Sequence, residues 1–364
     1  MTFFDELNSL KIEETVTTLP IISKETVEQT LKKPTLTLAD FPTLISPNAL
    51  PYLEIMAQKA HTLTKQRFGN TMQLFIPMYL SNLCFNKCTY CGFSVEHKYP
   101  RVTLTPDEIM AEAKLLQQKG FQHVLLLTGE AQGVVDVNYI SKAVAQVKPL
   151  FASVGIEIQP LNEAEYIIMI NAGADSLTLY QETYHQGAYA QYHLAGKKKN
   201  FKHRLDAVEA GGKAGFYRIN IGALLGLYDW QYEAIALAHH AQYMQKKYWK
   251  SKYSISLPRI QKMVGQFNAS HLISNAQFVQ LICAFRLIFP DIGITLSTRE
   301  SAELRNHLIP LGITTMSAES KTEPGGYSGK EAEQQFQTSD HRSLEEIKSL
   351  LIQKGYEPVL KDWH

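Results

Sequence analysis

Short apolar runs alternate with longer amphipathic segments along most of this chain. The alternation begins near Met72 and then continues through eight apolar runs. They cover residues 73–80, 123–128, 155–158, 175–179, 217–221, 253–257, 293–297 and 313–317. Apolar runs of this length between turn residues predict buried strands.

The segments between the runs predict helices with recognisable ends. Thr105-Pro106-Asp107-Glu108 offers an N-cap, a proline at the first helical position and a capping-box glutamate, and this helix closes at Gly120. A second helix starts at Asn162 and ends near Gly173. Further helices are expected over 201–210, 230–248, 276–288 and 301–308, the first of them ending at Gly211-Gly212.

Eight strand–helix repeats predict an α/β fold, a TIM-like (βα)8 barrel over residues 71–320. Residues 1–70 predict an N-terminal helical extension that is interrupted by prolines, with helices near 24–32 and 52–66. Residues 321–364 form a polar C-terminal tail with a helix near 344–354, which we expect to pack on the barrel and to cap or plug one end. An open doubly wound sheet is the alternative, but no G-x-G-x-x-G follows the first run.

The amino-acid composition and net charge limit the kinds of function that the chain can have. Hydrophobic residues make up 45% of the 364 residues and charged residues 20%, an ordinary globular mixture. The net charge of +1 gives no electrostatic case for nucleic acid or an anionic membrane as a partner. No apolar run reaches the roughly 18 residues of a membrane span, and the N-terminus lacks the pattern of a secretory signal. We therefore expect a cytoplasmic protein.

Three of the four cysteines stand close together in the sequence. Cys84, Cys88 and Cys91 have the spacing C-x3-C-x2-C, just after the first predicted strand. Three soft thiolates favour an iron–sulfur cluster and leave one iron of a 4Fe–4S cluster open for another ligand. A zinc-stabilised, non-catalytic binding module with His97 as fourth ligand is the alternative. Cys283 lies in an apolar helical pattern and is expected to be a core thiol.

In a barrel of this type, functional residues lie where the strands end. This rule selects Glu130, Glu182, Arg299 and Ser317, and the glycine-flanked turn 222–226 that contains Leu225. Each also has a structural interpretation: the carboxylates could be ordinary loop residues, and Arg299 could pair with a neighbouring glutamate. Arg259 is expected to be a surface charge, and the lysine run 197–199 a solvated loop.

With Tyr90 before its last cysteine, the motif resembles the signature of the radical S-adenosylmethionine (SAM) enzymes. Further stretches narrow the resemblance, over about residues 70–330, to the radical SAM aromatic amino-acid lyases, and within them to the tyrosine-cleaving branch of thiamine biosynthesis. These stretches are 128–130, 180–184, 203–205, 218–230, 296–300 and 320–327. The cysteine motif alone identifies the superfamily, and the later stretches identify the branch.

The resemblance implies a role for each candidate. Cys84, Cys88 and Cys91 would hold the 4Fe–4S cluster. Tyr90 and Leu225 would contact the adenine of SAM, and Gly129 and Glu130 would receive its methionyl amine. Glu182 and Arg204 would bind its polar groups, with Arg204 on the carboxylate. Arg299 and Ser317 would anchor the carboxylate of the substrate.

The implied reaction is the cleavage of the Cα–Cβ bond of L-tyrosine after a hydrogen atom is taken from its amino group. The products are p-cresol and 2-iminoacetate, the latter passed to thiazole synthase as a protein partner, and an external one-electron reductant is required. A tryptophan lyase is the alternative within the family. The related tyrosine lyase of hydrogenase maturation carries C-terminal cysteines, whereas this chain has none after Cys283.

Overall fold

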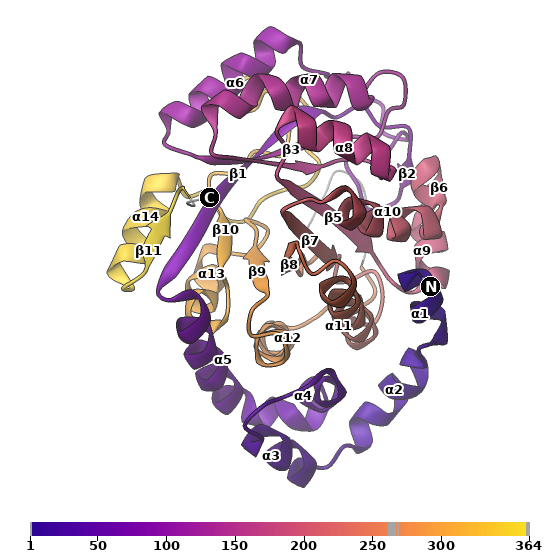
Figure 1. The fold of residues 1–364 in the computed structure, drawn as a ribbon, viewed down its shortest axis with the longest axis vertical. Helices are drawn as coiled ribbons and strands as arrows, with labels where there is room; N and C mark the ends of the chain where they lie inside the picture. Colours follow the sequence, from indigo (N-terminus) through magenta and orange to yellow (C-terminus); the bar gives the residue numbers. More distant parts are fainter. Residues whose placement is uncertain (1, 261–266, 268, 362–364) are drawn as a thin grey trace.

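Eight parallel strands close into a barrel at the centre of the molecule (Figure 1). The computed structural model describes residues 2–260, 267 and 269–361. Each barrel strand pairs with the next, and the last returns to the first through Gln73↔Thr315 and Phe75↔Ser317. The strands are β1 (Thr71–Ser81), β3 (His123–Thr128), β4 (Ser153–Glu157), β5 (Ser176–Glu182), β7 (Arg218–Ala223), β8 (Lys252–Ser256), β9 (Gly293–Leu296) and β10 (Thr315–Ser317). The eight predicted strands and the TIM-like barrel are confirmed.

Helices surround the barrel and bury the outward faces of its strands (Figure 1). On β1, Leu74, Ile76 and Met78 are fully buried on the outward face, while the alternate residues face the interior. The surrounding helices are α6 (Pro106–Gln118), α7 (Val137–Val147), α8 (Glu163–Ala172), α10 (Phe201–Ala214), α11 (Trp230–Lys247), α12 (Asn275–Ile288) and α13 (Ala302–Leu308). The capping boxes at Thr105 and Asn162 start α6 and α8 as predicted.

The predicted end of α10 at Gly211-Gly212 is wrong. The helix continues to Ala214 and ends at Gly215, which has the left-handed φ of 93°. A Cβ atom at Gly211 would lie 2.4 Å from Leu177, and one at Gly212 would lie 2.7 Å from Tyr248. These glycines therefore allow α10 to pack closely against its neighbours and do not terminate it.

The N-terminal extension runs along the outside of the barrel (Figure 1). Its helices are α1 (Phe3–Ser9), α2 (Ile12–Thr18), α3 (Lys24–Lys32), α4 (Phe41–Leu44) and α5 (Leu53–Phe68). The backbone amide of Phe3 donates to Glu209 on α10 at 2.6 Å. Gln280 on α12 donates to the carbonyls of Leu44 and Ser46 at 2.9 Å each. The extension is thus fastened to the barrel helices at both of these places, and the helices expected near 24–32 and 52–66 are confirmed.

The C-terminal tail reaches both ends of the barrel. Its last elements are α14 (Leu344–Gln353) and β11 (Glu357–Val359), and β11 pairs with the start of β1 through Thr71↔Glu357. An earlier part of the tail lies where the strands end, since the amide of Ser339 donates to the carbonyl of Thr298 at 2.9 Å. The boundary between barrel and tail at residue 320 stays a prediction. Among the described residues, no helix is long and apolar enough to cross a membrane.

Candidate active site

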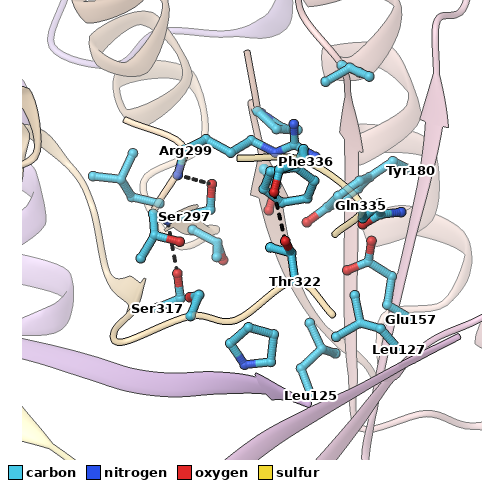
Figure 2. A pocket seen from close by; sticks show the side chains of 18 of the residues that line it. Leu125, Leu127, Glu157, Tyr180, Ser297, Arg299, Ser317, Thr322, Gln335 and Phe336 are labelled. Atoms are coloured by element: carbon cyan, nitrogen blue, oxygen red, sulfur yellow. Dashed lines mark hydrogen bonds between the residues drawn. The ribbon is translucent and has the colours of Figure 1, made fainter. Parts of the chain in front are cut away.

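A cavity opens at the end of the barrel where the strands terminate (Figure 2). It encloses about 1170 Å³, part of which is open to solvent. Its wall comes from the ends of the strands, and its cover includes Thr322, Gln335 and Phe336 of the C-terminal tail. The cavity therefore brings residues from both halves of the barrel together with the C-terminal tail. Gln335 of the tail contacts Cys91, although the two residues are 244 positions apart in the sequence.

The cysteine loop follows β1 and forms one edge of this cavity. A short strand, β2 (Lys87–Cys88), pairs antiparallel with β6 (His193–Ala195), neither of which was predicted. Asn86 is buried and donates to Glu130 at 2.6 Å and to the Cys84 sulfur at 3.7 Å. Its side-chain oxygen accepts from the backbone amide of Lys198 at 3.0 Å. Asn86 thus links the cysteine loop to the end of β3 and to the segment after β6.

The thiols suit an iron–sulfur cluster. All four cysteines are free, and Cys91 lines the cavity. No three His, Cys, Asp or Glu side chains of the described residues gather as a single metal ion would require. In a 4Fe–4S cluster each thiolate binds a different iron, so such convergence is not needed, whereas zinc takes four ligands around one ion. Burial raises the pKa of the Cys88 and Cys91 thiols, so metal binding would release their protons.

Glu182 is the centre of a buried charge cluster. The end of β5 bulges, and Glu182 adopts the left-handed φ of 73°. Its carboxylate accepts from Lys198 at 2.6 Å and from Arg204 at 3.1 Å. Burial acts to raise the pKa of Glu182, but the charges of Lys198 and Arg204 outweigh it and hold the pKa at about 2. Glu182 is therefore ionised, as its predicted role toward SAM requires, although that role itself stays a prediction.

The expectation that the lysine run forms a solvated loop is wrong for Lys198. This side chain lines the cavity and binds Glu182. Burial opposes its charge, and so does Arg204, yet Glu182 raises the pKa of Lys198 above its usual value. The β2–β6 pairing folds this segment over the cysteine loop, and a run of three lysines gives no sign of such a contact.

Tyr90 lines the cavity beside Cys91. Its hydroxyl lies 2.7 Å from Nε2 of the buried His193, and the ammonium of Lys198 lies 5.7 Å from its ring centre. These contacts fix the ring with one face toward the charge cluster. The contact of Tyr90 with an adenine stays a prediction.

Four predicted SAM contacts, Gly129, Glu130, Arg204 and Leu225, are not on the cavity wall. A Cβ atom at Gly129 would lie 2.2 Å from the Leu83 carbonyl oxygen, so a glycine is needed there for the cysteine loop to pack against β3. Glu130 holds Asn86 of that loop. Leu225 is 1% exposed and packs in the core, whereas its neighbour Leu224 lines the cavity. The roles of Gly129, Glu130, Arg204 and Leu225 toward SAM remain predictions.

Arg299 and Ser317 both line the cavity on the side of β9 and β10 (Figure 2). The Ser317 hydroxyl accepts from the amide of Thr298 at 3.1 Å. No carboxylate within the described ranges pairs with the Arg299 guanidinium. Burial lowers its pKa from the ordinary arginine value, although Tyr79 and Glu157 act in the opposite direction. The role of both residues as anchors of a substrate carboxylate stays a prediction.

Glu300, one of the neighbouring glutamates that could have paired with Arg299, binds Arg259 instead. Arg259 Nε donates to Glu300 at 2.9 Å, and a second nitrogen of the guanidinium donates to the other carboxylate oxygen. The Arg259 side chain is only 17% exposed. The prediction that Arg259 is a surface charge is therefore wrong.

The sequence reasoning missed Glu157, Gln335 and Phe336 as cavity residues. Gln335 accepts from the Tyr79 hydroxyl at 2.7 Å and donates to the Cys91 sulfur at 3.8 Å. Glu157 could have been found, because it continues the inward-facing alternation of β4. The tail residues carried no comparable signal, since their segment shows no strand or helix periodicity.

Comparison with known proteins decides the family. A model of the radical SAM superfamily matches residues 78–238, and one of the Biotin and Thiamin Synthesis associated domain matches residues 256–357. The 2-iminoacetate synthase of Salmonella typhimurium is 44% identical over 339 residues, which is 93% of this chain and 90% of that protein. The chain belongs to the 2-iminoacetate synthase family. The Escherichia coli 2-iminoacetate synthase matches with the same identity and coverage.

Solved structures agree with this membership of the 2-iminoacetate synthase family. The FeFe-hydrogenase maturase HydG from Carboxydothermus hydrogenoformans is 31% identical, with a TM-score of 0.91 over 99% of this chain and 85% of that one. The predicted resemblance is confirmed, and the protein is a radical SAM carbon–carbon lyase with a 4Fe–4S cluster and SAM as cofactors. This replaces the zinc-stabilised module as the interpretation of the cysteines.

Proposed function

We propose that this protein cleaves the Cα–Cβ bond of L-tyrosine and forms 2-iminoacetate and p-cresol. The observation that carries the proposal is that the Arg299 guanidinium, which no described carboxylate pairs with, lines the same cavity as Ser317, Cys91 and Tyr90. An amino acid held there by its carboxylate would lie next to the cysteine loop. The 44% identity to curated 2-iminoacetate synthases over nearly the whole chain supports the same reaction.

The residues of the cysteine loop and its surroundings would hold the cofactors. Cys84, Cys88 and Cys91 would bind the cluster, and the adenine would lie against Tyr90. Glu182 is ionised and Arg204 is charged, and they would bind polar groups of SAM, with Arg204 on its carboxylate. When bound, the cluster and SAM supply a deoxyadenosyl radical, which removes one hydrogen atom from the substrate.

Arg299 and Ser317 would orient the substrate. A planar guanidinium binds a carboxylate through two parallel hydrogen bonds and so fixes direction as well as affinity. Fixing the carboxylate at β9 and β10 places the amino group and the Cα–Cβ bond inside the cavity. Loss of one hydrogen from the amino group allows the Cα–Cβ bond to break. The nitrogen fragment is the imine of glyoxylate. The hydroxybenzyl radical takes up one electron, supplied by the external one-electron donor, and one proton from solvent to become p-cresol.

The rest of the wall would protect this chemistry from water. Apolar side chains contribute much of it, among them Pro77, Leu125, Leu127, Leu224 and Leu257. These groups offer no exchangeable protons and exclude solvent, and the tail residues cover the opening. A closed apolar site prevents side reactions of a reactive intermediate.

We infer that thiazole synthase takes the product from this enzyme, because an imine such as 2-iminoacetate hydrolyses in water. An external one-electron donor would reduce the cluster. Reduced clustered thiols are typical of the cytoplasm, which we infer to be where the protein works.

The test is a competition between two substrates. Reconstituted protein is incubated anaerobically with a reductant, SAM and equal concentrations of L-tyrosine and L-tryptophan. We expect p-cresol and little indole product. An excess of indole product would assign the protein to tryptophan cleavage and refute the proposed substrate.

A further inference from the structure

Glu157 differs from the other carboxylates of the cavity. Three glutamates line it: Glu157, Glu182 and Glu300. Glu182 is bound by Lys198 and Arg204, and Glu300 by Arg259. Among the residues that the structure describes, no cation or hydrogen-bond donor is paired with the carboxylate of Glu157. Burying a carboxylate without a partner costs free energy. A cation bound beside Glu157 would reduce this cost.

The cavity also holds a cation, Arg299, that no carboxylate of the described residues pairs with. Glu157 ends β4, and Arg299 follows β9. In the closed barrel three strands separate β4 from β9 in either direction, so the two strands face each other across the mouth. Figure 2 shows both side chains reaching into the same cavity. They lie too far apart to pair directly, since no salt bridge joins them.

We propose that Glu157 binds the α-ammonium group of the amino-acid substrate while Arg299 binds its carboxylate. This inference rests on the proposed function only in taking an amino acid as the substrate. A zwitterion brings one cation and one anion, and the cavity offers one unpaired partner for each. No other unpaired carboxylate of the described residues lines the cavity, so an ammonium bound elsewhere in it would remain uncompensated.

The electrostatics of Glu157 agree with a site prepared for a cation. Burial raises the pKa of Glu157 to about 7, and the charge of Glu182 adds to the effect. Arg299, Arg204 and Lys198 act in the opposite direction but do not restore an ordinary pKa. The apolar neighbours Leu125 and Leu127 contribute no compensating charge. A substrate ammonium would stabilise the ionised carboxylate.

Glu157 could in principle accept the phenol hydroxyl of tyrosine instead, and an equilibrium binding experiment separates the two roles. L-tyrosine and 3-(4-hydroxyphenyl)propionate share the phenol and the carboxylate, but only tyrosine has the amino group. Both ligands are titrated anaerobically into reconstituted wild-type protein and into Glu157→Gln, which keeps the shape and removes the charge. We expect the substitution to weaken tyrosine about 10- to 100-fold and to leave the propionate within about twofold.

Two control variants sharpen the result. Glu157→Asp keeps the charge and should retain most of the preference for tyrosine over the propionate. Glu300→Gln removes a carboxylate from the same cavity, but one already bound by Arg259, and should leave the ratio of the two affinities unchanged. Thermal unfolding of each variant checks that it is folded. If Glu157→Gln does not fold, the preference of Glu157→Asp for tyrosine over the propionate still tests whether Glu157 binds the ammonium.

The possible outcomes differ clearly. If Glu157→Gln lowers the affinity for tyrosine and for the propionate equally, and leaves the affinity for phenylalanine unchanged, Glu157 binds the phenol hydroxyl and the proposal is wrong. The proposal is also wrong if neither affinity falls. If the wild-type protein binds tryptophan and not tyrosine, the proposed substrate is wrong, and tryptophan with indole-3-propionate becomes the pair to compare. Comparing these two ligands then tests whether Glu157 binds the ammonium group, whichever aromatic side chain the substrate has.

Discussion

The guanidinium carbon of Arg299 lies 3.4 Å from the centre of the Phe336 ring. Phe336 belongs to the tail, and its carbonyl accepts from the Thr322 hydroxyl at 2.7 Å. Stacking on a ring face holds the guanidinium plane while leaving its N–H edge free for a carboxylate. The tail therefore does more than cover the cavity, because it orients the residue proposed to anchor the substrate.

Replacing Phe336 by leucine tests this relationship. The change keeps an apolar side chain and removes the ring, so we expect tyrosine affinity to fall about 3- to 30-fold, the range of an enclosed cation–π contact. SAM binding should be unchanged, because Phe336 stacks on Arg299, which is proposed to anchor the substrate and not SAM. Calorimetric titration of both ligands measures the two effects. Equal losses for SAM and tyrosine would indicate general damage to the site.

Arg299→Lys tests the carboxylate anchor itself. A lysine keeps the charge but cannot form the planar pair of hydrogen bonds. We expect weaker tyrosine binding and uncoupled turnover, in which deoxyadenosine forms without an equal amount of p-cresol. Quantifying both products in the same reaction gives the coupling ratio. A wild-type ratio together with wild-type tyrosine affinity would remove Arg299 from the site.

The cysteines can be separated by single substitutions. Cys84→Ala, Cys88→Ala and Cys91→Ala should each abolish cluster retention and SAM cleavage, because the loop offers three thiols and a cluster of this kind uses all of them. Cys283 is completely buried on α12, away from the loop, and Cys283→Ala serves as the matched control. Iron and sulfide analysis with the electron paramagnetic resonance spectrum of the reduced protein provides the measurement. Full cluster content in any of the first three variants would contradict the assignment.

The tail is fastened by a buried ion pair whose loss should be measurable as stability. Arg305 and Asp340 are 0% and 1% exposed and bind each other, and Arg342 adds a contact to Asp340 at 2.6 Å. Asp340→Asn leaves the Arg305 charge uncompensated, so we expect the free energy of unfolding to fall by about 3–5 kcal/mol in denaturant titrations at pH 7. Asp291→Asn removes an exposed pair with Arg67 and should cost under about 1 kcal/mol.

The same ion pair has a defined pH dependence. Burial acts to raise the pKa of Asp340, but Arg342 and Arg305 outweigh it and hold the pKa at about 2. The contribution of Asp340 to stability is thus complete above its ordinary pKa near 4 and is lost as the pH falls toward 2. The difference in stability between wild type and Asp340→Asn should shrink over this interval. A difference that is constant between pH 7 and pH 3 would contradict the ion-pair explanation.

The parts of the fold that sequence could predict are those fixed by local pattern. The eight strands are buried runs with clear ends, and the capping boxes at Thr105 and Asn162 mark helix starts. Helix α7 was missed although the Asp136 carboxylate caps it by accepting from the backbone amide of Tyr139. Lys198 and Phe336 could not be placed, because their positions depend on pairings with residues far away in the chain. Sequence thus identified Arg299 and Ser317 at strand ends, where both line the cavity, and missed the residues that long-range contacts bring to the same cavity.

The central claim is that the cavity couples SAM cleavage to the fragmentation of tyrosine. The most direct measurement is a single anaerobic incubation of reconstituted wild-type protein with reductant, SAM and L-tyrosine, followed by quantification of deoxyadenosine and p-cresol. We predict equal amounts of the two products, and neither product from the Cys91→Ala protein. Deoxyadenosine formed from the wild-type protein without p-cresol, or no dependence of either product on tyrosine, would contradict the claim.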